Sequence, residues 1–397
     1  MIYISGSYNI NLNLSLNLNY MNLKILLIII CMGLIAACSQ SLPVNQQELT
    51  DGDIETFYTG SVGVNIFIFD SPYKSPVLSY KIYCSGDDPK HDPFNWTLKG
   101  SDNGKNWFVV DERSNQMFYS RFQEIICEVR NPDNYKRYML EVISANEKDV
   151  LKVSEVMFSD KNLLKAWKPF NYPEVNFNIE EPNAEGSKLY GQLVQNPDEY
   201  IKYHTMKVAE ILYFSAEDSM PDIHGINYVL KDYDGVSAKS GSPPVISIIY
   251  STRHIENSAK ESIYKLDFET RGVLYHELVH GYQFEPKGIG SYGTNKEFWA
   301  CIEGIADAVR AEAGFFDWNT RRAGGHWLDG YRTTGFFIQW LTTKDPDAIR
   351  KFHTTVKDLD VWSFDGAIKR VFGDNTGIEG MWKEYQDFLN NNILTEL

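Results

Sequence analysis

The sequence predicts a multidomain protein in which an all-β sandwich is followed by an α+β domain that is mostly helical. Three observations support this prediction. The length of 397 residues allows two or three domains. Short alternating apolar runs, separated by turn residues, fill the chain between residues 48 and 160. Apolar residues at helical spacing then dominate from about residue 265 to the C-terminus.

Ahead of the sandwich, residues 1–37 have the features of an export signal. Residues 1–20 form an uncharged Asn/Leu/Ser run, so we expect translation to start at Met21. A lysine and the apolar run 25–34 follow, and two alanines precede Cys38. A basic start, a short apolar segment and small residues are typical of a secretory signal. The apolar run is short for a membrane span, although a plain signal peptide and a membrane anchor stay open as alternatives.

The Ala-Ala-Cys38 sequence resembles the lipobox of bacterial lipoproteins. The resemblance implies cleavage before Cys38 and lipidation of its thiol, which would tether a soluble body to a membrane surface. Ser39 follows the cysteine, and by the same resemblance this favours the outer membrane of a Gram-negative cell. We therefore expect an exported lipoprotein that is periplasmic or surface-exposed.

The sandwich is predicted from five strand-like segments that alternate with turns. These segments are residues 64–69, 78–83, 107–110, 125–129 and 138–143. Gly, Pro, Asp and Asn residues lie between them. Many short strands at such spacing indicate an antiparallel sandwich.

The middle of this region resembles the coagulation-factor 5/8 type C, or discoidin-like, jelly-roll domain. The matching sequences are Tyr-Lys-Ile-Tyr-Cys-Ser-Gly-Asp-Asp at 80–88, the run from Asp92 to Trp107, and Asp-Glu-Arg at 111–113. The resemblance implies a glycan or other surface ligand, bound by loops at one end of the sandwich. A spacer that binds nothing is the alternative, because a fold does not define a function.

Two pairs of residues in the sandwich need a separate interpretation. We interpret Trp96 and Trp107 as core residues rather than ligand platforms. Cys84 and Cys127 fall on different predicted strands, and whether they form a disulfide is left open because sequence alone gives no geometry.

Residues 161–180 are expected to form a proline-containing linker, and residues 175–397 the second domain. Within that domain we expect a helix over residues 196–214 and strands at 226–230 and 245–251. The strand 245–251 is a candidate edge on which an extended peptide could pair.

The sharpest motif of the chain is His276-Glu277-Leu-Val-His280. On a helix, side chains four residues apart point to the same side, so both imidazoles can share one tetrahedral metal ion. Glu277 would then lie near the open coordination position, where a carboxylate can take a proton from water. A structural helix with two surface histidines is the alternative.

A third metal ligand is expected from a second helix that contains Glu303 and, one turn later, Asp307. We favour Glu303 as the ligand because this helix face is unusually apolar. Asp307 would then accept a hydrogen bond from a ligand histidine. Asp307 as the ligand stays open. Two histidines and a glutamate form the ligand set of thermolysin-type zinc sites, so Zn²⁺ is the expected cofactor. We interpret Cys301, on the same helix, as a buried small apolar residue.

Three sequence blocks also resemble the basic secretory protein family. They are His-Glu-Leu-Val-His-Gly-Tyr-Gln at 276–283, the segment 302–314, and His-Trp-Leu-Asp-Gly-Tyr-Arg-Thr-Thr-Gly-Phe-Phe at 326–337. Members are secreted zinc peptidases of the HExxH superfamily from plants and bacteria. The resemblance implies a zincin-like fold, zinc binding by His276, His280 and Glu303, and base catalysis by Glu277. The acidic composition of this chain departs from the family's name.

Hydrolysis of an amide also requires a donor for the developing oxyanion. Tyr331 and His326 are the candidates, because a helix after the third block could return over the cleft. Both could instead be ordinary core or surface residues.

These observations predict a membrane-tethered zinc metallopeptidase, with a protein or glycoprotein substrate and an accessory glycan-binding domain. A glycan-binding surface lipoprotein, an adhesin without enzymatic activity, is the alternative. The formal charge of −15 argues against a nucleic-acid partner, which would require clustered lysine and arginine.

Overall fold

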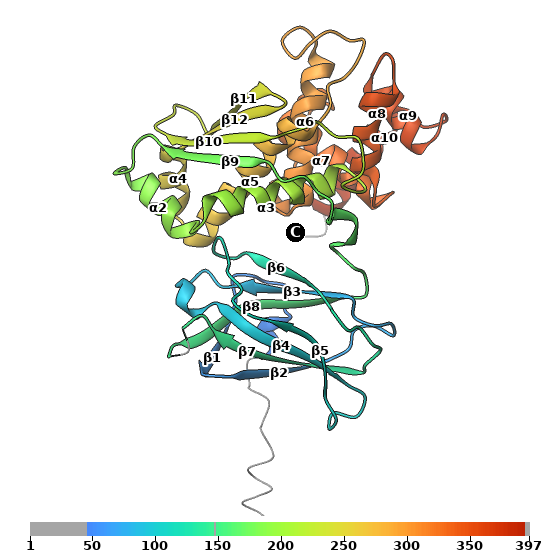
Figure 1. Ribbon diagram of the computed structural model, residues 1–397. Coiled ribbons are helices and arrows are strands. Elements are labelled where there is room, and N and C mark those ends of the chain that lie inside the picture. Colours follow the sequence, from blue (N-terminus) through green and yellow to red (C-terminus); the bar gives the residue numbers. More distant parts are fainter. Residues whose placement is uncertain (1–45, 147, 394–397) are drawn as a thin grey trace, which may run out of the picture. The chain divides into compact units, whose positions relative to one another are not determined.

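The computed structural model describes residues 46–146 and 148–393 (Figure 1). The predicted export signal and Cys38 lie outside these residues. The described part contains two regions: a sandwich of eight strands between residues 58 and 159, and a C-terminal region of strands and helices between residues 174 and 393. The predicted order, an all-β sandwich followed by a mostly helical region, is confirmed.

The sandwich consists of two four-stranded sheets, with strand orders β1-β8-β3-β6 and β2-β7-β4-β5. All pairs within them are antiparallel. The strands are β1 (Tyr58–Val62), β2 (Asn65–Asp70), β3 (Ser79–Cys84), β4 (Pro93–Ser101), β5 (Phe108–Arg113), β6 (Glu124–Glu128), β7 (Arg137–Ser144) and β8 (Val150–Ser159). Side chains alternate between the two faces of each strand, so the apolar members of both sheets meet in one core.

Two interpretations of sandwich residues can be compared with this core. Trp96 is 2% exposed and belongs to it, as expected. Trp107 is only half-buried and lies outside the core, so its interpretation as a core residue was wrong. Cys84 and Cys127 are both buried free thiols.

The C-terminal region contains a four-stranded mixed sheet of order β11-β12-β10-β9. Its strands are β9 (Glu174–Ile179), β10 (Gly225–Lys231), β11 (Ser237–Ser242) and β12 (Val245–Ser251). The strands β9, β10 and β12 are parallel, and β11 pairs antiparallel with β12. Figure 1 shows the helices α2 to α5 on one side of this sheet.

The helices are α2 (Glu185–Leu193), α3 (Pro197–Leu212), α4 (Thr252–Ala259), α5 (Ile263–Tyr282), α6 (Lys296–Glu312), α7 (Tyr331–Trp340), α8 (Ala348–Asp358), α9 (Phe364–Phe372) and α10 (Ile378–Ile393). Short 3₁₀ turns lie at Gln46–Leu49, Pro89–His91, Lys165–Trp167, Trp318–Thr320 and Leu341–Thr343. Within the described ranges, no helix is long and apolar enough to cross a membrane.

Two expectations about this region are corrected by the sheet. The expected linker 161–180 ends in the strand β9, whose alternating exposed and half-buried residues suit an edge position. Residues 245–251 do form a strand, but they are covered on both sides by β10 and β11 and cannot receive a peptide. The edges of the sheet are β9 and β11, and β11 is the edge next to β12. The sequence of β11, Ser-Ala-Lys-Ser-Gly-Ser, has no β-branched or aromatic residue and gave no strand signal.

The two helices that carry the predicted site residues, α5 and α6, begin at side-chain caps. The hydroxyl of Ser262 accepts a hydrogen bond from the Lys265 amide at the start of α5, and Asn295 accepts two at the start of α6.

Helix α7 packs closely on α6 because glycines lie at the contact. A Cβ atom on Gly304 would lie 2.4 Å from Thr334, and one on Gly335 would lie 2.6 Å from Asp307.

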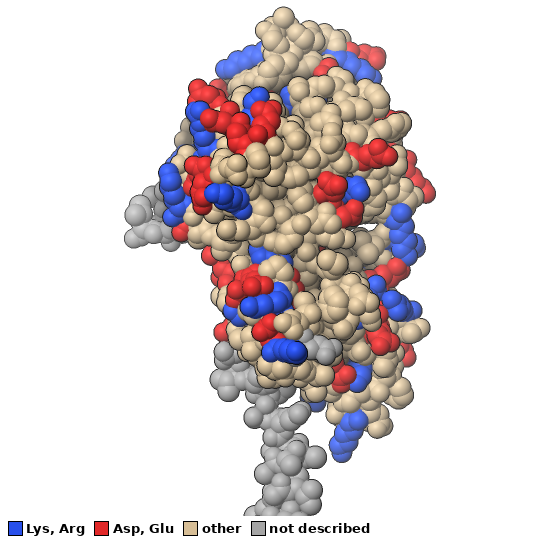
Figure 2. Space-filling view, turned by 60° about the vertical axis from the view of Figure 1, so that its left-hand side comes forward, with Lys and Arg blue, Asp and Glu red and all other residues tan. Residues whose placement is uncertain are grey.

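The surface carries charges of both signs. On the face that Figure 2 shows, lysine and arginine residues are interspersed with aspartate and glutamate residues. Exposed ion pairs occur on the surface of the described residues, for example between Lys188 and Glu185.

Candidate active site

Helix α5 brings His276 and His280 to the same side, one turn apart. Their Nε2 atoms are 3.1 Å from each other. The ring planes are almost perpendicular, at 89°. Both rings are largely buried and line a cavity beside the sheet. The motif therefore places two imidazole nitrogens at one point.

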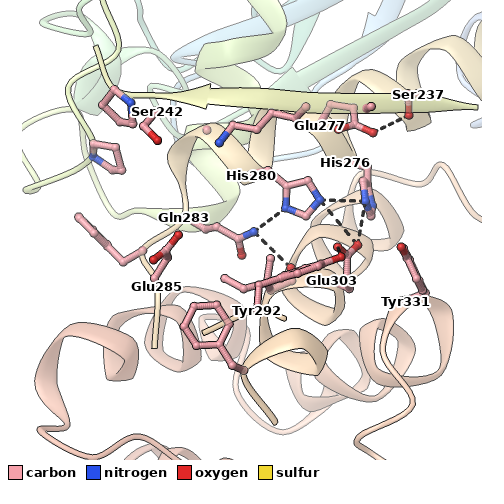
Figure 3. A pocket seen from close by; sticks show the side chains of 18 residues that line it. Ser237, Ser242, His276, Glu277, His280, Gln283, Glu285, Tyr292, Glu303 and Tyr331 are labelled. Carbon is pink, nitrogen blue, oxygen red and sulfur yellow. Dashed lines mark hydrogen bonds and ion pairs between the residues drawn. The ribbon is translucent and has the colours of Figure 1, made fainter. Parts of the chain in front are cut away.

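Helix α6 adds the carboxylate of Glu303 at the same point. Its Oε2 atom lies 3.2 Å from Nε2 of His276 and 3.7 Å from Nε2 of His280 (Figure 3). This oxygen is buried and accepts no hydrogen bond. Three atoms that can each donate a lone pair to a metal thus converge.

The spacing of these three atoms can be tested against a metal site. Zinc binds histidine nitrogens and carboxylate oxygens at about 2.0–2.2 Å in tetrahedral geometry, which separates neighbouring ligand atoms by roughly 3.3–3.6 Å. The observed separations of 3.1, 3.2 and 3.7 Å fall around this range. The residues present therefore fit a zinc ion.

The Nδ1 atom of each imidazole, which faces away from the cluster, contacts a polar side chain. Asp307 Oδ1 lies 2.7 Å from Nδ1 of His276, and this carboxylate favours a proton on Nδ1 and leaves Nε2 free to bind a metal. The Nε2 atom of Gln283 lies 2.7 Å from Nδ1 of His280 and donates to the backbone oxygen of Ile302. Metal binding through Nε2 of His280 requires a proton on Nδ1, so the Gln283 amide would have to rotate and present its oxygen there.

The two imidazoles differ in how readily they take a proton. Burial disfavours protonation of His276, but the neighbouring carboxylates of Asp307 and Glu303 outweigh it and raise its pKa to about 10. Burial and the neighbouring His276 lower the pKa of His280 to about 3. Burial opposes ionisation of Glu303, yet His276 and His280 hold its pKa below the ordinary value. The two rings and the carboxylate therefore share one positive charge, which His276 carries.

Glu277, one residue further along α5, points to a different partner. Its Oε1 atom accepts a hydrogen bond of 2.5 Å from the hydroxyl of Ser237 on the edge strand β11. Burial raises the pKa of this carboxyl group. Figure 3 shows Glu277 beside β11 and apart from the cluster formed by His276, His280 and Glu303.

Two tyrosines complete the wall of the site. The ring of Tyr331, the first residue of α7, stacks on the His276 ring at 6.1 Å between centroids. The Tyr292 hydroxyl, from the loop between α5 and α6, donates a 2.6 Å hydrogen bond to Oε1 of Glu303. Both side chains are about half exposed and can reach a bound substrate.

His326 does not belong to this site. Its Nδ1 atom accepts a hydrogen bond from the Leu328 amide, and its ring stacks on Trp327 at 3.7 Å. It lines neither of the cavities at the cluster. Its candidacy as an oxyanion donor was wrong, because the turn before α7 folds its ring back onto the neighbouring tryptophan.

Two cavities, of about 730 and about 510 Å³, meet at the cluster. Both are lined by Ser237, His276, Glu277 and Tyr331. Together they form a cleft on both sides of the histidines, with β11 as one wall. An extended chain could lie in this cleft.

Sequence reasoning missed four residues that line the site: Ser237, Lys239, Gln283 and Tyr292. Gln283 lies within the matching block 276–283 and could have been found by its position, three residues after His280. The other three lie on an edge strand and a loop, where the sequence pattern carries no signal for what they face.

Comparison with known proteins identifies the C-terminal region. Residues 172–385, more than half of the chain, match the family described as "Peptidase of plants and bacteria". The chain belongs to this family. The match contains every residue of the candidate site, and it confirms the resemblance that the three sequence blocks indicated.

Other matches are partial. A peptide-N(4)-(N-acetyl-β-glucosaminyl)asparagine amidase of Arabidopsis thaliana is 29% identical over 110 residues, which are 26% of this chain and 15% of that protein. Among solved structures, an F5/8 type C domain from Bacteroides fragilis matches 30% of this chain and 81% of its own, with 14% identity and a TM-score of 0.26. A family 32 carbohydrate-binding module from Streptococcus pneumoniae EndoD matches 28% and 81%, with 11% identity and a TM-score of 0.24.

Proposed function

We propose that this protein is a zinc-dependent peptidase that hydrolyses peptide bonds of proteins or glycoproteins in the cleft beside β11. One observation carries the proposal. The buried Oε2 atom of Glu303, which accepts no hydrogen bond, faces two histidine nitrogens at the separations expected for ligands of one zinc ion. The arrangement of these ligands, on two packed helices beside a sheet, is also what leads us to propose a zincin-like fold.

His276, His280 and Glu303 would hold the zinc ion. When bound, zinc supplies a Lewis acid, which polarises the scissile carbonyl and makes water a stronger nucleophile at neutral pH. Asp307 would keep the His276 imidazole in the tautomer that binds metal.

Glu277 is the proposed general base. Its carboxylate takes a proton from the attacking water as the water oxygen bonds to the carbonyl carbon. The same proton is then delivered to the amide nitrogen as the C–N bond breaks, which yields a carboxylic acid and an amine; the acid then gives its proton to the amine. The raised pKa of Glu277 suits both steps, and the Ser237 hydroxyl fixes the direction of its carboxylate.

Tyr331 is the proposed donor for the oxygen that gains negative charge during the attack. Its side chain lies at the wall of the cavity, whereas the Tyr292 hydroxyl already donates to Glu303. The strand β11 offers its unpaired backbone groups to an extended substrate, which would pair with it as a further strand.

A variant series tests this function. We expect the wild-type protein, dialysed and analysed by mass spectrometry, to retain about one zinc per chain and to cleave a protein substrate such as casein. Glu277→Gln should keep the zinc but lose roughly 10³-fold in kcat/KM. Glu303→Gln should lose the zinc as well. Glu312→Gln, on α6 but outside the cluster, is the matched control. Hydrolysis that survives in Glu277→Gln would reject the proposal.

The remaining sequence expectations stay predictions. Glycan binding by the sandwich, a lipid anchor at Cys38 and an outer-membrane location each depend on a resemblance. The alternative of an adhesin without activity would be supported by glycan binding together with the absence of zinc and of cleavage in the series above.

A further inference from the structure

The edge strand β11 places one lysine inside the cleft. Ser237 and Lys239 are two residues apart, so their side chains leave the same face of the strand. The residues paired with them, Tyr250 and Ile248, are fully buried on the helix-covered face of the sheet. Because Ser237 is held by Glu277, the side chain of Lys239 begins about 7 Å further along the strand, in the larger cavity.

The ammonium group of Lys239 lacks a contacting partner. The side chain is half-buried, yet it forms no hydrogen bond or ion pair with any described residue. The similarly buried Lys207, in contrast, is paired with Glu210. Burial lowers the pKa of Lys239. The carboxylates of Glu285 and Glu277 oppose that shift, but neither forms an ion pair with the lysine. A half-buried ammonium group is costly without a contacting partner, so binding of an anionic ligand would stabilise it.

The lining of the larger cavity makes this cation distinct. Lys239 is the single lysine or arginine among its described lining residues. Apolar side chains, Phe284, Phe298 and Ile302, also line this cavity. A weakly hydrated wall strengthens the attraction between an ammonium group and a carboxylate, because the effective dielectric constant falls.

We infer that Lys239 binds a carboxylate of the substrate, two to three residues from the scissile bond, and so selects for acidic peptides. The inference rests on the proposed peptidase function. Two sources share this chemistry: the side chain of an aspartate or glutamate, and the C-terminal carboxylate of a short peptide. Lys239 here is a specificity residue. It takes no part in proton transfer.

The experiment uses peptides with one cleavable bond and blocked ends, in which glutamate or glutamine occupies each of the three positions on either side. A further pair ends in a free carboxylate or an amide. For the wild-type protein we expect glutamate to raise kcat/KM about tenfold over glutamine at one position. This ratio should fall to about one in Lys239→Met and below one in Lys239→Glu. Lys188→Met, a surface change on α2, should keep the ratio.

The free-end pair separates the two sources. If Lys239→Met changes only the kcat/KM ratio between peptides with a free carboxylate and with an amide end, the site binds the chain terminus. If it changes the glutamate-to-glutamine ratio at an internal position, the site binds an acidic side chain. A ratio unchanged in Lys239→Met, or an equal loss for all peptides with the ratio intact, would overturn the inference, since the lysine would then act only through Glu277 or the fold.

A binding measurement distinguishes failure of this inference from failure of the proposed function. Fluorescence anisotropy with the Glu277→Gln protein gives the Kd of the glutamate and glutamine peptides without turnover. If no peptide is cleaved by the wild-type protein but this Kd ratio still depends on Lys239, the carboxylate site stands and the peptidase function fails. If cleavage occurs and neither ratio depends on Lys239, the reverse holds.

Discussion

Two buried groups of charged side chains, one in the sandwich and one in the C-terminal region, are built in opposite ways. In the sandwich, Arg121 donates to both oxygens of Asp92 at 2.7 Å, and it also donates to the backbone oxygen of Asp87. In the C-terminal region, His276, His280 and Glu303 turn lone pairs toward one another, and Oε2 of Glu303 has no donor. The first group is complete within the chain. The second presents acceptor atoms without a matching donor, and we propose that a zinc ion completes it.

The largest expected effect concerns the complete pair. Arg121→Met should lower the free energy of unfolding of the sandwich by about 3–5 kcal/mol, because Asp92 would remain as a buried charge without a partner. Urea unfolding followed by circular dichroism measures this loss. Replacing both residues, Asp92→Leu with Arg121→Met, should recover much of it. If Arg121→Met is as stable as the wild type, the Arg121–Asp92 pair does not stabilise the sandwich and the contrast with the histidine cluster fails.

A smaller effect is expected at Asp307, which contacts the Nδ1 atom of His276. Asp307→Asn should weaken zinc affinity by about 10- to 100-fold, since the neutral amide holds the His276 imidazole less firmly. Competition with a chromophoric chelator measures the affinity, with Glu312→Gln as the control on the same helix. Unchanged zinc affinity would show that Asp307 is a structural acid, like Asp92.

The smallest expected effect concerns Glu269, an acid on α5, the helix that also carries His276 and His280. Unlike Glu303, Glu269 forms ion pairs within the chain, with Lys265 and Arg310. Burial opposes its ionisation, but His254, Lys265 and Arg310 lower its pKa below the ordinary 4.5. The folded state therefore binds this proton less readily than the unfolded state. Glu269 stabilises the protein above about pH 4.5, and this contribution is lost as the pH falls.

The test compares the pH dependence of Tm in the wild type and in Glu269→Gln. At pH 7 we expect the wild type to melt a few degrees higher. The two curves should converge as the pH drops below 4.5. A constant difference down to pH 3 would mean that Glu269 acts through packing rather than through its charge.

The sequence predicted the parts of the molecule whose periodicity reports burial. The apolar spacing of α5 and α6 placed His276, His280, Glu303 and Asp307 on helices, and helical geometry then brought them together. What it could not predict depends on partners distant in the chain. The strand β11 forms because β12 offers hydrogen bonds to a polar segment, and Tyr292 reaches Glu303 only through the path of a loop. The misplacement of His326 has the same origin.

The glycines between α6 and α7 have a consequence for the chemistry. With no side chain at Gly304 or Gly335, the two helices touch backbone to side chain, so Glu303, Asp307 and Tyr331 belong to one stiff block. A methyl group added at position 304 would overlap Thr334 on α7, the helix whose first residue is Tyr331. We therefore expect the position of Tyr331 beside His276 to depend on a glycine that lines neither cavity.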